Sequence, residues 1–399
     1  MKKILPLLLL MVVSTAFAQD LYVNPTGSDS NAGTQAQPFL TIQHAANLVK
    51  AGQTVHVAPG TYNVTGISTS TSGTASNPIT FISDTQWGAH IVQTTDTDAC
   101  WRIGGSFITI QGFDITEGSN GSCRIGIENI SGNNVKILHN RIHDLTKNSS
   151  IASCSSAGGA GFESASDSSG GVDLTYTLDS NYIYHIGDYT NLNCPYIQGI
   201  YTNGHGNGSP GSVVVTNNVV FEIISFGLNI NSSNTVVANN TTFHNGAGGI
   251  FLDNSRGCYD TQQIVNNIVF DVGIGSPRQV GISYRYSCGT SANSSAVDNL
   301  VFMSSGTEAN NWSTNGSFSH TGDVQANPQF VSYTGDQKGD YHLKAGSAAI
   351  DAGTTSRAPA TDFDDISRVV PIWIGAYQSN GSVSGSAPAP PTGLLATVN

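Results

Sequence analysis

The sequence predicts an all-β parallel β-helix, and three observations lead to that fold class. First, the chain of 399 residues has 45 glycines and only 11% charged residues, whereas a typical soluble domain has about 25%. Second, a short strand recurs between about Cys100 and Met303. Third, an asparagine in a second short strand follows each recurrence. The low charge excludes a coiled coil, a basic nucleic-acid binder and a charged disordered tail.

The N-terminus has the pattern of an export signal. Lys2 and Lys3 precede an apolar run over residues 4–13, and Ala16-Phe17-Ala18 fits a small-x-small cleavage site. The run is shorter than the ~20 residues that span a bilayer, and no later segment is long enough either. We therefore expect residues 1–18 to be removed after Ala18 and the protein to be secreted, to the periplasm, the cell surface or the medium.

The net charge narrows the choice of partner. The chain carries −12 at neutral pH, and removal of Lys2 and Lys3 with the signal makes this −14 (−12 minus two positive charges). Such a charge excludes nucleic acids and anionic membranes as partners. An acidic polysaccharide would need a local arginine or a bound cation to hold it.

A glycine followed by an apolar residue opens each recurring strand. The asparagine comes later in the same repeat, and the shortest interval, from Asn218 to Asn240, is 22 residues. Longer intervals are expected where loops are inserted into a basic coil of that size. The strand glycines are Gly126, Gly161, Gly199, Gly227, Gly249 and Gly281. The asparagines are Asn140, Asn181, Asn218, Asn240, Asn267 and Asn299.

A strand repeat this short cannot bury its own apolar side chains, so successive repeats must stack. Stacking at the ~4.8 Å strand spacing places equivalent residues over each other. The asparagines then form a ladder, each amide bonding a turn and the next asparagine. Three residues further on we expect an aromatic column, mainly structural, along one wall. Its members are His143, Tyr184, Phe221, Phe243, Phe270 and Phe302.

The two ends of the chain differ from the repeat. Residues 41–50 have helical periodicity and are expected to cap the open first coil. After Asn327 the segments 340–343 and 350–353 are expected to form the closing coil. We thus predict a β-helix domain over residues 19–378. Residues 379–399 are predicted to be a Gly/Ser/Ala/Pro-rich linker and tail.

The six cysteines favour disulfides, because their number is even and the protein is expected to be exported. No Cys-x-x-Cys pair supports a zinc site. Fifteen pairings are possible for six cysteines, and the coil register favours one of them, in which neighbouring coils are joined. The predicted pairs are Cys100–Cys123, Cys154–Cys194 and Cys258–Cys288.

Six short motifs stand at the two ends of the chain. They are Leu-Tyr-Val-Asn-Pro at 21–25, Pro-Phe-Leu-Thr-Ile-Gln at 38–43, Val-His-Val-Ala-Pro-Gly-Thr-Tyr at 55–62, Asn-Pro-Gln-Phe at 327–330, Gly-Ser-Ala-Ala-Ile-Asp-Ala-Gly at 346–353 and Ile-Gly-Ala-Tyr at 374–377. They resemble motifs of the pectate-lyase-like superfamily, and in particular of the branch with family 9 polysaccharide lyases. With the coils, this resemblance covers nearly the whole chain and implies a single-stranded, right-handed parallel β-helix with an N-terminal helical cap.

The resemblance also implies an activity and a cofactor. Lyases of this family combine Ca²⁺ held by acidic residues with a lysine or arginine base. The repeat region has only Lys136 and Lys147, neither on a glycine-led strand. The family's base is therefore not carried over to a residue of this chain, and Ca²⁺ is the one cofactor that the resemblance implies.

Side-chain alternation predicts a polar outer face on the glycine-led strands. The residue after each glycine is apolar and points inward, so the next residue and the one two further on point outward. Amides, carboxylates and rings suit a sugar chain. We assign Tyr201, His205 and Arg285 to catalysis. We assign Glu128, Glu163, Asn203, Asn229, Asn231, Phe251 and Asp253 to substrate binding.

The resemblance, together with this polar face, implies β-elimination on a uronic-acid-containing polysaccharide. Arg285, or a cation held by the acidic residues, would neutralise the uronate carboxylate, while Tyr201 and His205 would serve as base and acid. Two alternatives remain. A glycoside hydrolase would use Glu128 and Glu163 as its acid/base pair. A non-catalytic carbohydrate-binding or cell-surface protein would present the same face without chemistry. In each case we expect a monomer that binds a polysaccharide.

Overall fold

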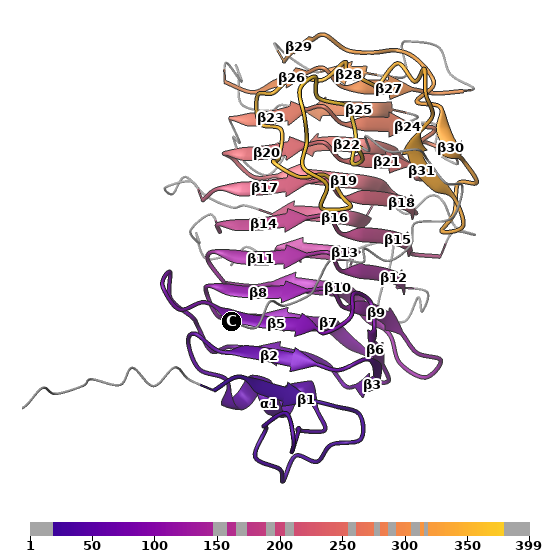
Figure 1. Cartoon of the computed structure of the whole chain (residues 1–399). Helices are drawn as coiled ribbons and strands as arrows, with labels where there is room; N and C mark the ends of the chain where they lie inside the picture. Colours follow the sequence, from indigo (N-terminus) through magenta and orange to yellow (C-terminus); the bar gives the residue numbers. More distant parts are fainter. Residues whose placement is uncertain are drawn as a thin grey trace, which may run out of the picture.

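The computed structural model describes residues 19–146, 158–164, 174–188, 196–203, 211–253, 261–274, 280–285, 293–304, 312–314 and 318–378. In these residues the chain winds coil upon coil around one elongated core (Figure 1). Each full coil adds one strand to each of three parallel sheets. The predicted right-handed parallel β-helix is confirmed. No helix in the described ranges is long and apolar enough to cross a membrane.

Sheet 1 opens each coil and has 11 strands, all parallel to their neighbours. Its inward residues are mostly valine and isoleucine, which pack well in strands that stack directly on one another. The strands are β1 (Leu21–Val23), β2 (Thr54–Val57), β5 (Ile79–Ser83), β8 (Ile108–Gln111), β11 (Val135–Leu138), β14 (Tyr176–Asp179), β17 (Val213–Thr216), β20 (Thr235–Ala238), β23 (Gln262–Val265), β26 (Ser295–Val297) and β29 (Ser319–Thr321).

Sheet 2 follows a sharp corner and has nine strands. The strands are β3 (Gly60–Val64), β6 (Ala89–Gln93), β9 (Asp114–Glu117), β12 (Arg141–Leu145), β15 (Tyr182–Ile186), β18 (Val219–Ile223), β21 (Thr241–Phe243), β24 (Ile268–Phe270) and β27 (Leu300–Phe302). At the corner, a residue with positive φ precedes each ladder asparagine, for example His139 (φ 53°) and Asn239 (φ 56°). Histidine, asparagine and aspartate tolerate this left-handed conformation better than most residues.

Sheet 3 closes each coil and also has nine strands. It contains the glycine-led strands of the repeat. The strands are β4 (Ile67–Thr69), β7 (Thr97–Ile103), β10 (Cys123–Asn129), β13 (Gly159–Ser164), β16 (Ile197–Asn203), β19 (Phe226–Asn231), β22 (Gly248–Asp253), β25 (Val280–Arg285) and β28 (Trp312–Thr314). The glycines are required because a Cβ at Gly126 would lie 2.5 Å from the Gly161 carbonyl oxygen and from a methyl group of Ile142.

The predicted asparagine ladder is confirmed. The Asn240 Oδ1 accepts from the backbone N–H of Asn218 and from its Nδ2, both at 2.9 Å. Asn240 in turn donates from both groups to the Asn267 Oδ1. The same pattern continues along the coils from Asn140 to Asn299. Because every member is buried and paired, the ladder fixes the register of the coils at this corner.

The predicted aromatic column is also present, on the outer side of sheet 2. His143 stacks on Tyr184 with ring centroids 4.9 Å apart and planes 3° apart. Tyr184 stacks on Phe221 at 5.2 Å, and Phe221 stacks on Phe243 at 4.8 Å. Phe270 and Phe302 continue the column. Phe221 and Phe243 are fully buried although they lie outside the coils, so another part of the chain must cover them.

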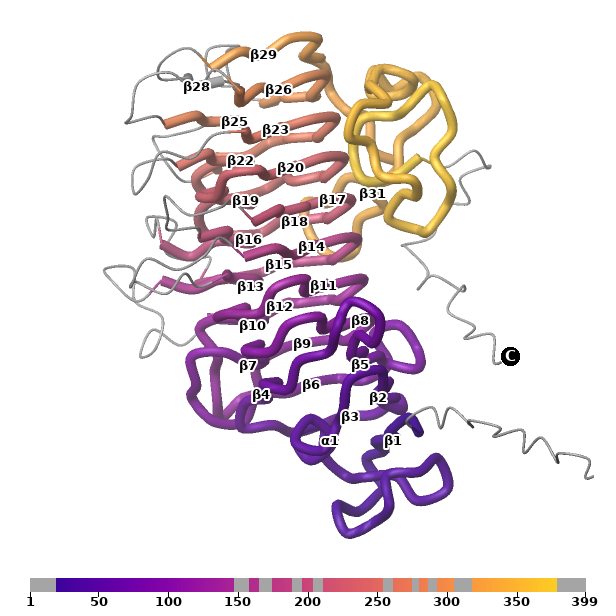
Figure 2. Tube along the Cα trace, turned by 90° about the vertical axis from the view of Figure 1, so that its left-hand side faces the viewer, coloured from indigo at the N-terminus to yellow at the C-terminus, as the bar shows by residue number. Residues whose placement is uncertain are grey.

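That cover is the C-terminal segment, and the predicted closing coil is wrong. Residues 325–378, which follow β29 and the bridge at Val324, leave the last coil and run back alongside the later ones (Figure 2). Two of their strands, β30 (Phe330–Ser332) and β31 (Asp340–Leu343), pair antiparallel and join none of the three sheets. Tyr341 packs 4.1 Å from Phe243, measured between ring centroids. The segment folds this way because an outward aromatic column is stable only when apolar side chains shield it from water.

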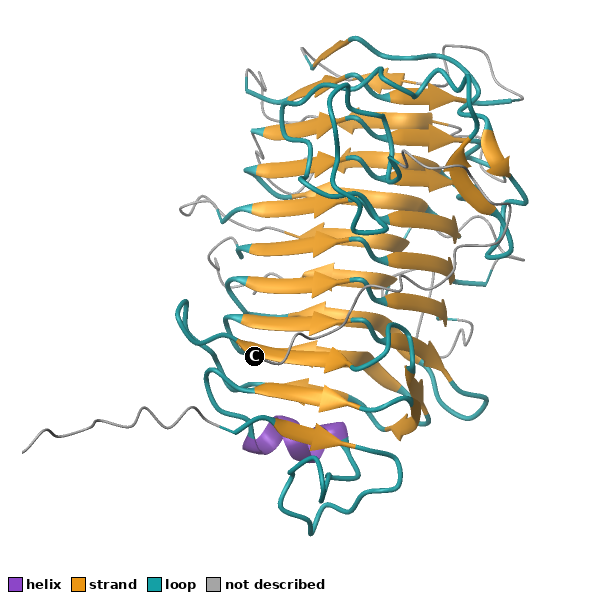
Figure 3. Cartoon of the chain, in the orientation of Figure 1, coloured by secondary structure: helices purple, strands orange, loops and turns teal. Residues whose placement is uncertain are grey.

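The N-terminal end has the predicted helix, α1 (Ile42–Leu48), shorter than expected (Figure 3). Thr41 is its N-cap and accepts from the His44 N–H at 3.2 Å. Ile42 and Ala45 are buried in the main core. The helix lies at the N-terminal end of the stack (Figure 1), and its function as a cap stays a prediction.

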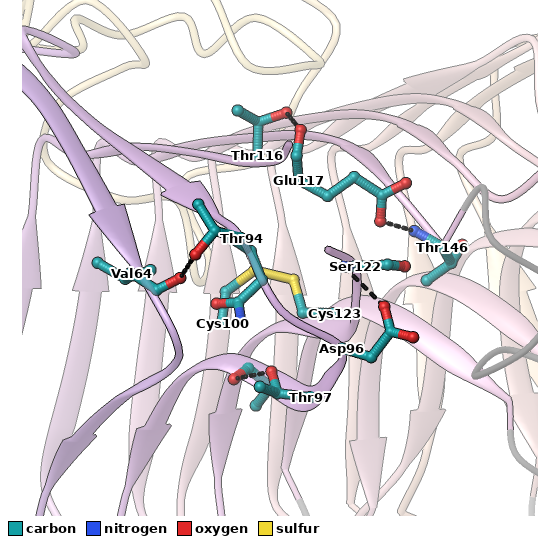
Figure 4. The surroundings of a disulfide bond; sticks show 12 residues. Val64, Thr94, Asp96, Thr97, Cys100, Thr116, Glu117, Ser122, Cys123 and Thr146 are labelled. Atoms are coloured by element: carbon teal, nitrogen blue, oxygen red, sulfur yellow. Dashed lines mark hydrogen bonds between the residues drawn. A yellow bond between two sulfur atoms is a disulfide. The ribbon is translucent and has the colours of Figure 1, made fainter. Parts of the chain in front are cut away.

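One predicted disulfide is confirmed. Cys100 and Cys123 join β7 to β10, with a Cα–Cα distance of 5.4 Å (Figure 4). Cys100 occupies the position that glycine takes in later coils, since its neighbour Trp101 is in register with Ile127. The other four cysteines, Cys154, Cys194, Cys258 and Cys288, lie outside the described residues.

Candidate functional site

The outer face of sheet 3 presents two columns of polar and aromatic side chains. The strand register places six residues of successive coils in one column, which are Glu128, Glu163, Tyr201, Asn229, Phe251 and Ser283. In the second column Asn203 pairs with Asn231, and Asp253 pairs with Arg285. The order along both columns is the one expected from the alignment of the repeats. His205 lies outside the described residues.

Burial differs from the expectation of an open outer face. Glu128 is 5% exposed, Asn229 is 6% exposed and Asn231 is fully buried. Side chains in stacked strands lie only ~4.8 Å apart, so neighbours on adjacent coils shield one another from water. An outward position in the repeat is therefore no guarantee of exposure.

Two arginines that the sequence analysis missed neutralise the stacked glutamates. The Arg102 Nε lies 2.6 Å from the Glu128 Oε2, and the Arg124 Nη1 lies 3.9 Å from the Glu163 Oε2. Both guanidinium groups also approach Asp98, at 3.5 and 3.6 Å. The N-terminal end of the face is thus a network of two cations and three anions rather than a repulsive pair of carboxylates.

Arg102 was missed because the alignment of repeats began one coil too late, and Arg124 was missed because it precedes its strand glycine, Gly126. Arg102 follows Cys100 and Trp101, where a cysteine replaces the strand glycine, yet it is in register with Glu128. A large inward residue at Trp101 was the signal that could have located it. Burial acts to lower the pKa of Arg102, but the hydrogen bond to Glu128 and its charge outweigh burial and raise that pKa. Arg102 is accordingly a permanent cation.

The middle of the face holds Tyr201 against a buried amide. Asn231 lies 3.2 Å from the Tyr201 hydroxyl. With its amide oxygen facing that hydroxyl, Asn231 accepts a hydrogen bond from Tyr201 and donates to the carbonyls of Ile230 and Asp253. A buried side chain with several hydrogen bonds has little freedom, so Asn231 positions the Tyr201 ring.

Two amide oxygens in the middle of the face lack partners. The Oδ1 atoms of Asn203 and Asn229 are buried and accept no hydrogen bond from any described residue. A buried acceptor left unpaired costs about 1–3 kcal/mol. A sugar hydroxyl is a donor that an amide oxygen can accept from.

The C-terminal part of the face has an aromatic pair. Phe226 and Phe251 stack with centroids 4.6 Å apart and planes 25° apart, and both are partly exposed. Phe226 was missed because it precedes its strand glycine. Exposed rings of this kind present a flat apolar surface to the face of a sugar.

The side chains on the sheet 3 face do not fit a calcium site. Glu128 and Glu163 are both engaged by arginines, and a hard divalent cation needs six to eight oxygen ligands. Among the described residues, no three His, Cys, Asp or Glu side chains gather as metal ligands. We therefore derive no chemical step through Ca²⁺.

A right-handed parallel β-helix with ionic, amide and aromatic side chains along one outer face has the architecture of a carbohydrate-active β-helix protein. Residues 21–192 match the family described as "Pel9A-like, right handed beta helix region". This match confirms the resemblance to the pectate-lyase-like superfamily.

One curated relative is similar to a short part of the chain, and two solved structures are similar in fold. Over 62 residues the chain is 47% identical to pectate lyase PEL9 of Emericella nidulans, a match that spans 15% of each chain. An alginate lyase from Paenibacillus sp. str. FPU-7 superposes with a TM-score of 0.52 at 15% identity, covering 77% of this chain and 95% of that one. A GH136 lacto-N-biosidase from Eubacterium ramulus gives 0.54 at 13% identity, covering 77% and 67%. Both superpositions show the fold alone.

Proposed function

We propose that the protein is an exported polysaccharide lyase that cleaves a uronic-acid-containing polysaccharide by β-elimination on the outer face of sheet 3. The observation that carries this proposal is that Tyr201 lies one coil after Glu163, whose carboxylate the Arg124 side chain approaches from the coil before. A cation and a proton-transfer group are thereby held on either side of the Glu163 carboxylate, on rigid strands of one face.

In the proposed reaction, Arg124 binds the uronate carboxylate and disperses the negative charge that develops when the C5 proton is removed. In its phenolate form Tyr201 takes the C5 proton and becomes the phenol. The C4–O bond breaks, and His205 in its imidazolium form donates a proton to the leaving oxygen. A C4=C5 double bond remains on the new end of the chain. Asn229 accepts from a sugar hydroxyl, and Phe226 and Phe251 support a neighbouring ring.

The test is ultraviolet absorbance of the unsaturated uronate during incubation with polygalacturonate, alginate and other uronic polysaccharides. We expect a rise on at least one substrate, which Tyr201→Phe and Arg124→Ala reduce by two orders of magnitude or more. A folded wild-type protein that gives no absorbance rise on any of them would refute the proposal.

The same assay separates the alternatives. New reducing ends without absorbance would indicate a hydrolase, and retention on a polysaccharide without either product would indicate a binding protein. A chelator tests the calcium that the family resemblance implies. We expect cleavage to survive the chelator, because arginines already engage Glu128 and Glu163.

A further inference from the structure

A second cleft lies on a different side of the molecule, where the β30–β31 hairpin meets the wall of sheet 2. Its volume is about 700 Å³, within the usual range for small-ligand sites. The residues that matter in its lining are Asn327, Gln329, Phe330, Ser332, Tyr333 and Lys344. None of them belongs to the sheet 3 face.

The cleft has a rigid aromatic wall. Tyr333 is 37% exposed, while the Phe270 and Phe330 rings that hold it are almost fully buried. Tyr333 meets Phe270 edge-on at 4.8 Å and lies 6.0 Å from Phe330 with planes 23° apart. A ring fixed in this way loses little conformational entropy when a ligand stacks on it.

The rim carries hydrogen-bonding groups and one cation. Lys344 is exposed and forms no ion pair with any described residue, although the chain has a net charge of −12. Gln329 has a positive φ of 54°, and its backbone N–H donates to the Asn327 Oδ1 at 2.8 Å. The side-chain amide of Gln329 and the Ser332 hydroxyl make no bond to another described residue.

The cleft is built by the C-terminal motif that the sheet 3 site does not use. Asn327, Gln329 and Phe330 come from the Asn-Pro-Gln-Phe motif at 327–330. Lys344 directly follows β31, and its backbone N–H donates to the Gln329 carbonyl at 2.9 Å. One hydrogen bond therefore holds the amide side and the cationic side of the cleft at a fixed separation.

We propose that this cleft binds one or two acidic sugar residues of a polysaccharide as a non-catalytic anchoring site. The sugar ring stacks on Tyr333, its carboxylate pairs with Lys344, and Gln329 and Asn327 bind its hydroxyls. Sugar as the ligand class rests on the proposed function. The cleft binds the polymer at a distance from the sheet 3 face. It therefore affects how strongly the protein is retained on the polysaccharide and leaves the chemical step unchanged.

The test is calorimetric titration with tetragalacturonate and tetramannuronate in a Tyr201→Phe background, which prevents turnover. In that background we expect two binding sites. Lys344→Ala or Tyr333→Ala should lower the affinity of the second site, the cleft, at least tenfold, so that only one site is detected. Tyr333→Phe keeps the ring and should retain both sites. Lys338→Ala is the matched control, because this exposed lysine lies in the same hairpin outside the cleft.

Three results would overturn the proposal. The first is unchanged stoichiometry and affinity in Lys344→Ala and Tyr333→Ala. The second is equal sensitivity to Lys344→Ala when xylotetraose replaces the acidic sugars, since the cation would then have no part in binding. The third is a change in oligomeric state in Tyr333→Ala with sugar binding intact, which would assign the cleft to a second copy of the chain. Failure of the lyase proposal shows separately, as absent ultraviolet product in the wild type.

Discussion

The outer faces of sheets 2 and 3 are built by the same repeat, but they differ in composition and in burial. On sheet 2 the outward column is aromatic, its rings stack in nearly parallel planes, and the C-terminal segment buries it. On sheet 3 the outward column is ionic, amide and aromatic. Two of its buried amide oxygens, on Asn203 and Asn229, have no partner in the described structure.

This difference separates structure from function within one repeat. The rings of Tyr184, Phe221 and Phe243 on the sheet 2 face are satisfied by packing, so they report on stability. On β15, β18 and β21, the one buried side-chain polar atom without a described partner is the Tyr182 hydroxyl, at the edge of a ring that is itself packed. The sheet 3 face keeps polar atoms that folding alone does not satisfy, at a cost in stability. Such a cost is expected where a ligand completes the interactions. Substitutions on the two faces should therefore differ in both size and sign.

The largest effect is expected from Phe243→Ala on sheet 2. Phe243 is fully buried between Phe221, Phe330 and Tyr341, so its loss should lower the free energy of unfolding by about 3–5 kcal/mol. Chemical denaturation measures the loss, and proteolysis should cut the cover, residues 325–378, first. Phe251→Ala on sheet 3 is the control, with a cost near 1 kcal/mol because its ring is half-buried. Equal costs would show that the two faces are packed alike.

The sequence predicted the coils well because the repeat is local. Asn218 and Asn240 are 22 residues apart and bond directly, so spacing alone gives the register of the ladder and of the sheet 3 columns. The C-terminal cover was not predictable in this way. Arg368 donates to the Asn217 side chain across 151 residues of sequence, and no periodicity encodes such a contact. Arg102 was missed for a smaller reason, since Cys100 replaces the glycine that marks each later coil.

A smaller effect is expected from the one ionisable ring of the aromatic column. His143 stacks on Tyr184, and its ring nitrogens lie 3.0 Å from Asp114 and 2.6 Å from Asp144. Burial acts to lower the pKa of His143, but the two carboxylates outweigh burial and raise that pKa above its usual value. The other charged groups around this site are Arg141, which also bonds Asp114, and His90 and His185, which pair with the same two aspartates.

The sign of the pH dependence follows from the raised pKa. The stabilisation by His143 is fully present below the unfolded pKa of about 6.5 and is lost as the pH rises through the folded value. His143→Phe keeps the stack and removes the charge. The free energy of unfolding of the wild type should exceed that of this variant by on the order of 1 kcal/mol near pH 6. The difference should shrink towards about pH 9. His56 and His342 titrate in both proteins, so their contributions to the pH dependence cancel in the difference. A difference that is constant with pH would show that His143 contributes only as a ring.

The smallest change in stability is expected from Asn229→Leu on sheet 3, and its sign decides the comparison. Asn229 is 6% exposed with an unpartnered Oδ1, so a leucine of similar size should raise the free energy of unfolding by up to about 1 kcal/mol while cleavage or sugar binding falls. Asn240→Leu is the matched control in the ladder. It removes the acceptor of the buried Asn218 backbone N–H and one of the donors to the Asn267 Oδ1, and should cost about 2 kcal/mol or more. If Asn229→Leu destabilises as Asn240→Leu does, the amides of the sheet 3 face serve the fold rather than a ligand.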